Sequence, residues 1–250
     1  MYGRSLVESF KHMVVMPLGG NRAFRLLISA IVYTTIFYPS SVFAQACSGL
    51  EITTTPAPSP SLRRQVLYFI QRHSVVSSDV DLILLGDSLA EGWDNGMFRR
   101  MSVVNLGVGG DKTQNVLWRL ASPEWSKLKP TNVVIILGTN NLGAHDRPCA
   151  VIAGLKKVIE RVKLIWPSTK IVFLEITPRG AAFLEYNSDR VEINAAIRDL
   201  AGIKTINVDD EITCGWQTAG QCPNYKTDNL HFSALGYQLI FKHLMQALEH

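Results

Sequence analysis

Residues with the chemistry of acyl transfer occur in four short stretches spread along the chain. Gly86–Leu89 offers a serine hydroxyl, Gly107–Asp111 offers backbone amides, Gly138–Asn141 offers side-chain amides, and Asp228–His231 offers a carboxylate and an imidazole. A serine hydroxyl is a weak nucleophile until a base removes its proton, and the attacked carbonyl oxygen needs hydrogen-bond donors. Together the four stretches hold every group that this reaction requires.

Each role in the reaction has a candidate residue. Ser88 is the candidate nucleophile, because it lies on a predicted strand-to-helix turn, where a helix N-terminus favours developing negative charge. His231 is the candidate base, and Asp228, three residues earlier, can accept a hydrogen bond from the second ring nitrogen and so fix the tautomer. The candidate oxyanion-hole donors are the amides of Ser88 and Gly110 and the side chain of Asn140.

The apolar pattern predicts alternating strands and helices that would bring these groups together. Short β-branched runs predict strands that are covered on both faces, over residues 80–85, 103–106, 133–137, 171–174 and 203–208. Helical spacing predicts helices over residues 62–73, 114–120, 149–165, 189–201 and 234–248. This alternation indicates a five-stranded parallel sheet in a three-layer α/β/α fold. In such sheets functional groups gather at the carboxyl ends of the strands.

The four stretches resemble the sequence blocks of the GDSL, or SGNH, hydrolase superfamily. The letters GDSL stand unaltered at 86–89, and the blocks follow the family's order over residues 80–240. NLGVGGDKTQNVLWRL (105–120) and GTNN (138–141) most resemble the branch that contains the catalytic subunits of platelet-activating-factor acetylhydrolase. Many members carry Asp where this chain has Asn141, but that branch also carries Asn.

The resemblance has implications for fold, activity and cofactors. It implies a flavodoxin-like fold and the activity of an esterase, a lipase or a carbohydrate deacetylase. It implies that Ser88, Asp228 and His231 are catalytic, that Gly110 and Asn140 complete the oxyanion hole, and that no metal or organic cofactor takes part.

Further side chains near the same edge of the predicted sheet are candidates for lining the substrate pocket. They are Asp87, Trp93, Asn141 and His145. Each also has a structural interpretation: a helix cap for Asp87, core packing for Trp93, a turn for Asn141 and a solvated loop for His145.

Two other classes of protein fit the sequence poorly. The glycine-rich sequence Gly107–Thr113 is similar to a phosphate-binding loop. However, Asp111 precedes Lys112, and its carboxylate would lie where the phosphate binds. A nucleic-acid-binding protein needs a basic face. Here the formal net charge is +4, and +3 of it falls in residues 1–46, which leaves the remainder close to neutral.

The N-terminal segment has the pattern of a secretory signal peptide. Arg22 and Arg25 precede an apolar run at 26–38, which is followed by Pro39 and by Ala44-Gln45-Ala46. We expect cleavage after Ala46, a linker over 47–61 and a hydrolase domain over 62–250. A retained anchor is the alternative, although the run is shorter than the ~20 residues that span a bilayer. Lipidation of a newly exposed Cys47 is a further alternative.

The cysteines lie in the part of the chain that export would carry out of the cytoplasm. They are Cys47, Cys149, Cys214 and Cys222. An even number in an oxidising compartment favours disulfides, with Cys214–Cys222 closing a short turn-rich loop and Cys47–Cys149 as the remaining pair. The alternative is that some are small buried hydrophobic residues.

The sequence therefore predicts a secreted or periplasmic serine esterase that removes short acyl groups, acetyl above all, from a lipid, a glycan or a small molecule. Two alternatives stay open: an acyltransferase that uses the same triad, and a non-catalytic module that binds glycan or envelope polymer. The predicted partner is a small ester and not a nucleic acid. Membrane association is expected only if the N-terminal segment is retained or Cys47 is lipidated, and both a monomer and a homodimer are compatible with the sequence.

Overall fold

A computed structural model of the protein describes residues 47–249, apart from residues 77 and 218. The predicted signal peptide, with its alternative as an anchor, lies outside the described residues. None of the helices in the described part of the chain is both long enough and apolar enough to cross a membrane.

The described strands form one five-stranded parallel sheet in the order β2-β1-β3-β4-β5. The strands are β1 (Ser78–Gly86), β2 (Val103–Gly107), β3 (Leu128–Ile136), β4 (Lys170–Leu174) and β5 (Ile203–Ile206). The predicted fold class is confirmed. β3 begins earlier than predicted, because its first residues alternate between buried and exposed positions and do not form a continuous apolar run.

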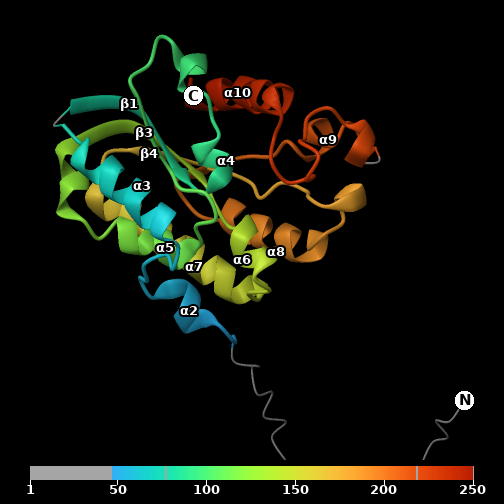
Figure 1. Ribbon diagram of the computed structural model, residues 1–250, viewed down its shortest axis with the longest axis horizontal. Coiled ribbons are helices and arrows are strands. Elements are labelled where there is room, and N and C mark those ends of the chain that lie inside the picture. The colour runs from blue at the N-terminus through green and yellow to red at the C-terminus, as the bar shows by residue number, and fades with distance from the viewer. Residues whose placement is uncertain (1–46, 77, 218, 250) are drawn as a thin grey trace, which may run out of the picture. The chain divides into compact units, whose positions relative to one another are not determined.

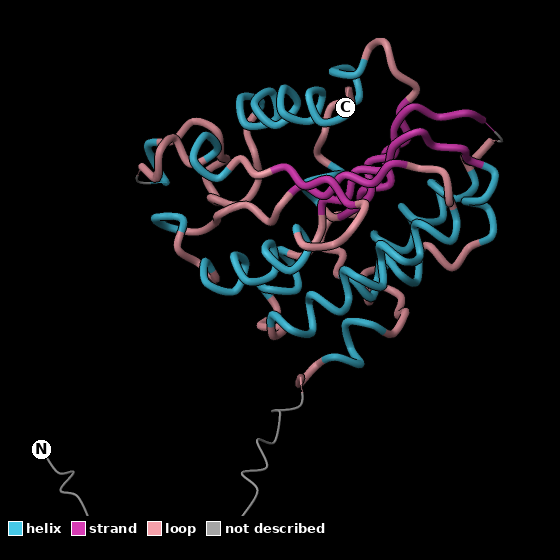
Figure 2. The backbone as a smooth tube through the Cα atoms, turned by 180° about the vertical axis from the view of Figure 1, so that it is seen from behind, coloured by secondary structure: helices cyan, strands magenta, loops and turns pink. Residues whose placement is uncertain are grey.

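Helices cover both faces of the sheet, which gives the three layers visible in Figures 1 and 2. One face carries α3 (Leu62–His73), α5 (Thr113–Arg119), α7 (Pro148–Ile165) and α8 (Asn187–Arg198), and the other carries α4 (Ser88–Glu91), α9 (Asp209–Ile212) and α10 (Ala234–Leu248). The remaining described α-helices are the short α2 (Leu50–Thr54) and α6 (Thr139–Gly143). Short 3₁₀ turns occur at 95–98, 123–127, 181–183 and 219–221.

Strand side chains alternate between two separate hydrophobic cores. On β1, Ile83 and Leu85 pack with α3, α5, α7 and α8, whereas Leu82 and Leu84 pack with α4 and α10. All four side chains are fully buried. Because both faces of each central strand are covered, the strands read as continuous apolar runs in the sequence.

The segment at 47–61 differs from the predicted linker. It contains α2, and the buried Thr53 donates a hydrogen bond from Oγ1 to the Ala150 carbonyl at 2.7 Å. A disulfide joins Cys47 to Cys149, and the Ala57 amide donates to the Gln114 carbonyl at 3.1 Å. The composition TTTPAPSPS suggested an open linker, but these residues are held by contacts distant in sequence.

Candidate active site

The turn that carries Ser88 is built by the end of β1 and the start of α4. Asp87 caps α4, and its Oδ1 accepts a hydrogen bond from the Leu89 amide at 2.9 Å. Ser88 is therefore the first residue of the helix. Gly107, at the end of β2, packs directly on this helix, since a Cβ at Gly107 would lie 2.1 Å from the Glu91 backbone nitrogen. Only glycine permits so close an approach.

His231 reaches Ser88 from the loop that precedes α10. Its Nε2 lies 2.8 Å from the Ser88 hydroxyl oxygen, and its Nδ1 lies 2.7 Å from Oδ2 of Asp228. The second carboxylate oxygen of Asp228 accepts hydrogen bonds from the amides of Leu230 and His231 at 3.0 and 2.9 Å. The structure thus brings a hydroxyl, an imidazole and a carboxylate into one chain of hydrogen bonds.

The loop that carries Asp228 and His231 is anchored by its own backbone. The Lys226 amide donates to the His231 carbonyl at 2.7 Å, which closes the loop at its base. Asn229 has a positive φ of 52°, and its carbonyl accepts from the Gly180 amide at 2.9 Å. These bonds fix the position of the imidazole relative to the sheet.

The environment of Asp228 keeps it ionised. Partial burial alone would raise the pKa of its carboxyl, but the hydrogen bonds from His231 and Leu230 outweigh burial and lower the pKa to about 2. A carboxylate can accept the Nδ1–H of His231 and leave Nε2 free to accept a proton. The arrangement suits a histidine that acts as a base toward Ser88.

A hydrogen bond links two parts of the predicted oxyanion hole, because Asn140 contacts the loop that contains Gly110. Gly110 adopts a positive φ of 80°, and the Asn140 side-chain amide, on α6, donates to the carbonyl of the adjacent Asp111 at 3.0 Å. Within the described residues, the backbone amides of Ser88 and Gly110 donate to no other protein group. Within this part of the chain, the N–H groups of Ser88 and Gly110 therefore have no competing protein acceptor.

Two buried carboxyls lie behind the nucleophile. Asp87 is 1% exposed, and burial, aided by the nearby charge of Asp111, raises the pKa of Asp87 to about 7 although the Leu89 amide opposes the shift. Burial also raises the pKa of Asp111, against an ion pair with Arg119 at 2.7 Å. The Oδ2 atom of Asp87 has no hydrogen-bond partner. A protonated Asp87 avoids leaving a buried charge beside Asp111.

The residues proposed to line the substrate pocket take different positions. Asn141 is fully buried, accepts from the Thr113 amide at 3.1 Å and donates to Asp146 at 2.9 Å. Trp93 is 4% exposed and packs against the Tyr237 ring with a centroid distance of 5.4 Å. Asp87 is buried as well, so the structure places all three side chains in the interior of the domain. Their residue types do not reveal burial in the sequence.

His145 lies on the surface. It is exposed, has a φ of 60°, and places its ring at the edge of the Tyr186 ring with a centroid distance of 5.6 Å. Among the described residues no hydrogen bond joins His145 to Asp146, and Oδ2 of Asp146 accepts from the Asn141 side chain. The structure does not bring His145 into the hydrogen-bond chain of Ser88, Asp228 and His231.

Sequence reasoning missed Glu91, which organises the glycine loop. Its carboxylate accepts hydrogen bonds from the Gly109 amide and, at 2.7 Å, from Arg63 on α3. Glu91 lies three residues after Ser88 and so on the same face of α4, which is the signal that could have suggested it. The Gly109 amide is therefore occupied by Glu91, whereas the amide of the next residue, Gly110, has no protein acceptor among the described residues.

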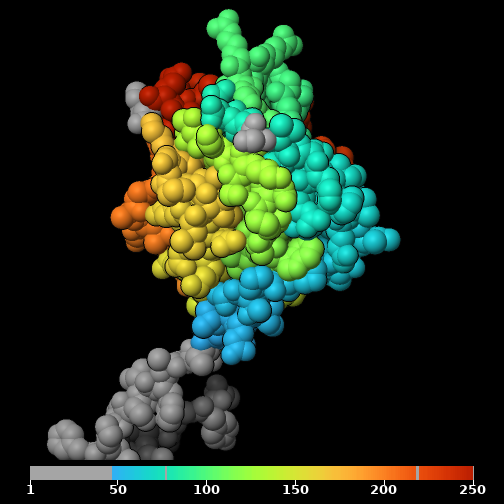
Figure 3. Space-filling view, turned by 90° about the vertical axis from the view of Figure 1, so that its left-hand side faces the viewer, coloured from blue at the N-terminus to red at the C-terminus, as the bar shows by residue number. Residues whose placement is uncertain are grey.

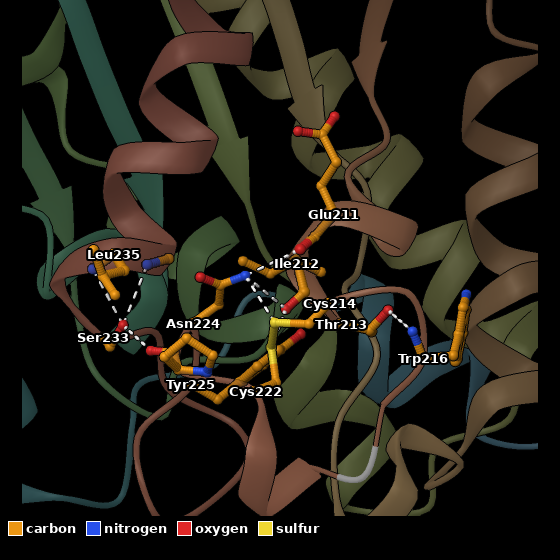
Figure 4. Close-up of a disulfide and its surroundings, with 12 residues drawn as sticks. Glu211, Ile212, Thr213, Cys214, Trp216, Cys222, Asn224, Tyr225, Ser233 and Leu235 are labelled. Carbon is orange, nitrogen blue, oxygen red and sulfur yellow. Dashed lines mark hydrogen bonds between the residues drawn. A yellow bond between two sulfur atoms is a disulfide. The ribbon is translucent and has the colours of Figure 1, made fainter.

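Both predicted disulfides are present. Cys47 pairs with Cys149, and Cys214 pairs with Cys222. Figure 4 shows Asn224 turned toward the second disulfide, with its side-chain amide donating to the Glu211 carbonyl at 3.0 Å and to the Cys214 sulfur at 3.4 Å. This cross-linked segment leads into the loop of Asp228 and His231. Disulfides are typical of proteins outside the cytoplasm.

Comparisons with known proteins identify the family. The model of the GDSL-like Lipase/Acylhydrolase family matches residues 84–239, a span that runs from the end of β1 into α10. Platelet-activating factor acetylhydrolase IB subunit alpha1 of Rattus norvegicus is 29% identical over 213 residues, which cover 80% of this chain and 90% of the relative. Subunit alpha2 of the same organism is 29% identical over 184 residues, covering 68% and 78%.

The fold also matches solved structures. A GDSL-like lipase from Bacteroides thetaiotaomicron superposes with a TM-score of 0.60 at 19% sequence identity, covering 74% of this chain and 96% of that one. The family match spans more than half of the chain, includes the GDSL turn and ends beyond His231. The chain therefore belongs to the GDSL-like lipase/acylhydrolase family and is a carboxylic ester hydrolase.

Proposed function

We propose that this protein is an exported serine esterase that hydrolyses short-chain esters, acetyl esters above all, through an acyl-enzyme on Ser88. The observation that carries the proposal is the continuous hydrogen-bond chain Asp228–His231–Ser88, with distances of 2.7 and 2.8 Å between successive side chains. The relatives named acetylhydrolases support the short acyl group. The apolar N-terminal segment and the paired cysteines support export.

In the proposed mechanism the Ser88 oxygen attacks the ester carbonyl carbon while its proton passes to Nε2 of His231. The amides of Ser88 and Gly110 and the Asn140 side chain donate hydrogen bonds to the carbonyl oxygen as it gains negative charge. When the tetrahedral intermediate collapses, the alcohol takes the proton from His231 and leaves. Water then attacks the acyl carbon, gives a proton to His231, and releases the carboxylic acid as the proton returns to Ser88.

Hydrolysis of p-nitrophenyl acetate tests this function. We expect turnover to fall by about 10⁴–10⁶ in Ser88→Ala and in His231→Ala, because members of a triad act as a unit. Ser188→Ala, which changes an exposed serine on α8, is the matched control and should retain full activity. Intact-mass analysis of the quenched reaction should find an acetyl group on the wild-type protein and none on Ser88→Ala.

Acyl length is tested with p-nitrophenyl esters of increasing chain length. We expect kcat/KM to be highest for acetyl and to decline as the chain grows. An unchanged rate in Ser88→Ala would contradict the proposed nucleophile, whereas a maximum at long chains would contradict only the acetyl preference.

A further inference from the structure

The helix α3 turns an apolar stripe outward. Leu62, Val66, Phe69 and Ile70 share one side of the helix by their spacing, and they are 74%, 48%, 54% and 54% exposed. We call these four residues the outer stripe. The opposite side holds the helix to the domain, through the buried Tyr68 and through Gln71, whose side-chain amide donates to the Gly107 carbonyl at 3.0 Å. In Figure 3 the cyan atoms of α3 form part of the molecular surface.

Cationic residues flank the outer stripe. By helical spacing, Arg63 and Arg72 lie at opposite borders of the outer stripe. α3 contains no acidic residue. Glu91 binds Arg63, and Glu124 binds Lys127 and lies near Arg72. Apolar side chains with arginines at their borders are typical of helices that lie in a membrane interface.

Arg63, at the N-terminal end of α3, is linked to the turn of Ser88. Arg63, next to the stripe residue Leu62, binds Glu91, which in turn binds the Gly109 amide. A Cβ at Gly109 would lie 3.5 Å from the Cβ of Ser88 and 3.8 Å from an Arg63 guanidinium nitrogen. The N-terminal end of α3, where the stripe begins at Leu62, is therefore the end of this helix that is connected to the Ser88 turn.

Charge and size favour a lipid surface over a second copy of the chain. A two-fold dimer places the same patch against itself, which would bring the arginines of both copies together. A stripe of four side chains offers a few hundred Å² at most, below the ~800 Å² per partner of a stable protein interface. An anionic bilayer accepts the apolar side chains and pairs its phosphates with the arginines.

We propose that α3 docks the enzyme on an anionic phospholipid bilayer. The outer stripe enters the boundary between headgroups and acyl chains, Arg63 and Arg72 contact lipid phosphates, and Ser88 faces acyl esters carried in that bilayer. This inference rests on the proposed esterase function for its substrate class, but the docking itself does not depend on catalysis.

Flotation with vesicles tests the docking. The full chain is mixed with vesicles of phosphatidylcholine alone or with added phosphatidylglycerol, and the bound fraction is measured at low and high salt. We expect binding to the anionic vesicles that weakens as salt screens the arginines. Leu62→Ser/Phe69→Ser should lower this binding tenfold or more, because the bilayer loses two of the apolar side chains that enter it. Arg72→Glu should weaken it as well, without removing an apolar stripe residue.

Leu164→Ser/Leu184→Ser is the matched control. It removes two leucines that are 74% and 64% exposed on other elements, and it should bind as the wild type does. Thermal melting establishes that each variant is folded. Equal flotation of the stripe variant and the wild type, or no flotation of either, would overturn the proposal. A stripe variant that only converts a dimer to a monomer in light scattering would assign the stripe to a second copy instead.

Flotation of Ser88→Ala separates this inference from the proposed function. We expect Ser88→Ala to bind vesicles as the wild type does, since no bond is made or broken in docking. An inactive protein that still floats through the outer stripe would contradict the esterase function alone. An active esterase that ignores vesicles would contradict the docking alone.

Discussion

The imidazole of His231 lies 2.8 Å from the hydroxyl oxygen of Ser88, although 143 residues separate the two in the chain. Ser88 is held by the end of a central strand, and His231 is held by a loop closed through its own backbone. Neither position depends on the hydrogen bond between them. The pair is therefore preorganised for proton transfer, which is the condition for general-base catalysis.

Replacing Asp228 with Asn tests the third member of the chain. Asn keeps an oxygen for the amides of Leu230 and His231 but cannot carry the charge that holds the Nδ1–H of His231. We expect kcat for p-nitrophenyl acetate, measured per folded molecule, to fall by about 10⁴, because the imidazole adopts the wrong tautomer. A loss below tenfold would show that His231 needs no carboxylate partner.

Asn140 and Asn141 are neighbours for which we predict opposite effects. Asn140 is partly exposed. Within the described residues its side chain makes one hydrogen bond, which it donates to the Asp111 carbonyl. Asn140→Ala should lower kcat by about 10²–10³, the cost of one oxyanion donor, and leave stability nearly unchanged. Asn141→Ala should instead lower the free energy of unfolding by about 1–3 kcal/mol, because it leaves buried partners unsatisfied.

Steady-state kinetics and urea unfolding on both variants check this contrast. If Asn140→Ala unfolds the protein while its kcat per folded molecule is unchanged, Asn140 is structural. If Asn141→Ala lowers kcat as far as Asn140→Ala at full stability, the donor role belongs to both residues.

The pKa of Asp87 predicts a pH-dependent stability. The carboxyl has an ordinary pKa of 3.8 in the unfolded chain and about 7 in the folded protein, where burial disfavours the charge. Between about pH 4 and pH 7 the folded protein holds this proton and the unfolded chain does not. The free energy of unfolding therefore falls as pH rises through this window and levels off above it.

Asp87→Asn removes that titration. We expect the stability of Asp87→Asn relative to wild type to be greater at pH 8 than at pH 5, measured by urea unfolding at both values. Asp228 does not interfere, because its lowered pKa of about 2 places its own effect below pH 4. A stability difference that is the same at pH 5 and pH 8 would mean that Asp87 is ionised throughout.

The two disulfides predict unequal losses of stability. Cys47–Cys149 spans a sequence separation of 102, and Cys214–Cys222 spans 8. Because a longer loop restrains the unfolded chain more, Cys47→Ser/Cys149→Ser should cost about 2 kcal/mol more than Cys214→Ser/Cys222→Ser. Urea unfolding under non-reducing conditions measures the difference. The reverse order would show that native contacts around Cys214 outweigh loop entropy.

Activity should respond in the opposite order. Cys214 and Cys222 lie in the segment before Asp228 and His231, whereas Cys47–Cys149 joins the start of the described chain to α7. We expect kcat to fall further in Cys214→Ser/Cys222→Ser. Equal kcat in both variants would show that the backbone bonds of the loop suffice to hold His231.

Local sequence patterns predicted most of the fold. Continuous apolar runs mark the strands because both faces of the sheet are covered, and helical spacing marks α3, α7 and α10. The sequence pattern did not predict the structure where contacts between residues distant in sequence determine it. Residues 47–61 resemble a linker, yet a disulfide and the buried Thr53 bind them to α7. The apolar side of α3 reads like a core-facing side, yet it faces outward.

For the candidate site, the sequence by itself determined which groups are present and which of them follow predicted strands, since residue type and position along the chain are local properties. Only the tertiary structure decided which of them meet. It joined Ser88 to His231, buried Trp93 and Asn141 in the interior, and gave Glu91 to the Gly109 amide. The reason is physical: hydrogen bonds and burial depend on distances in space, and separation along the chain does not fix those distances.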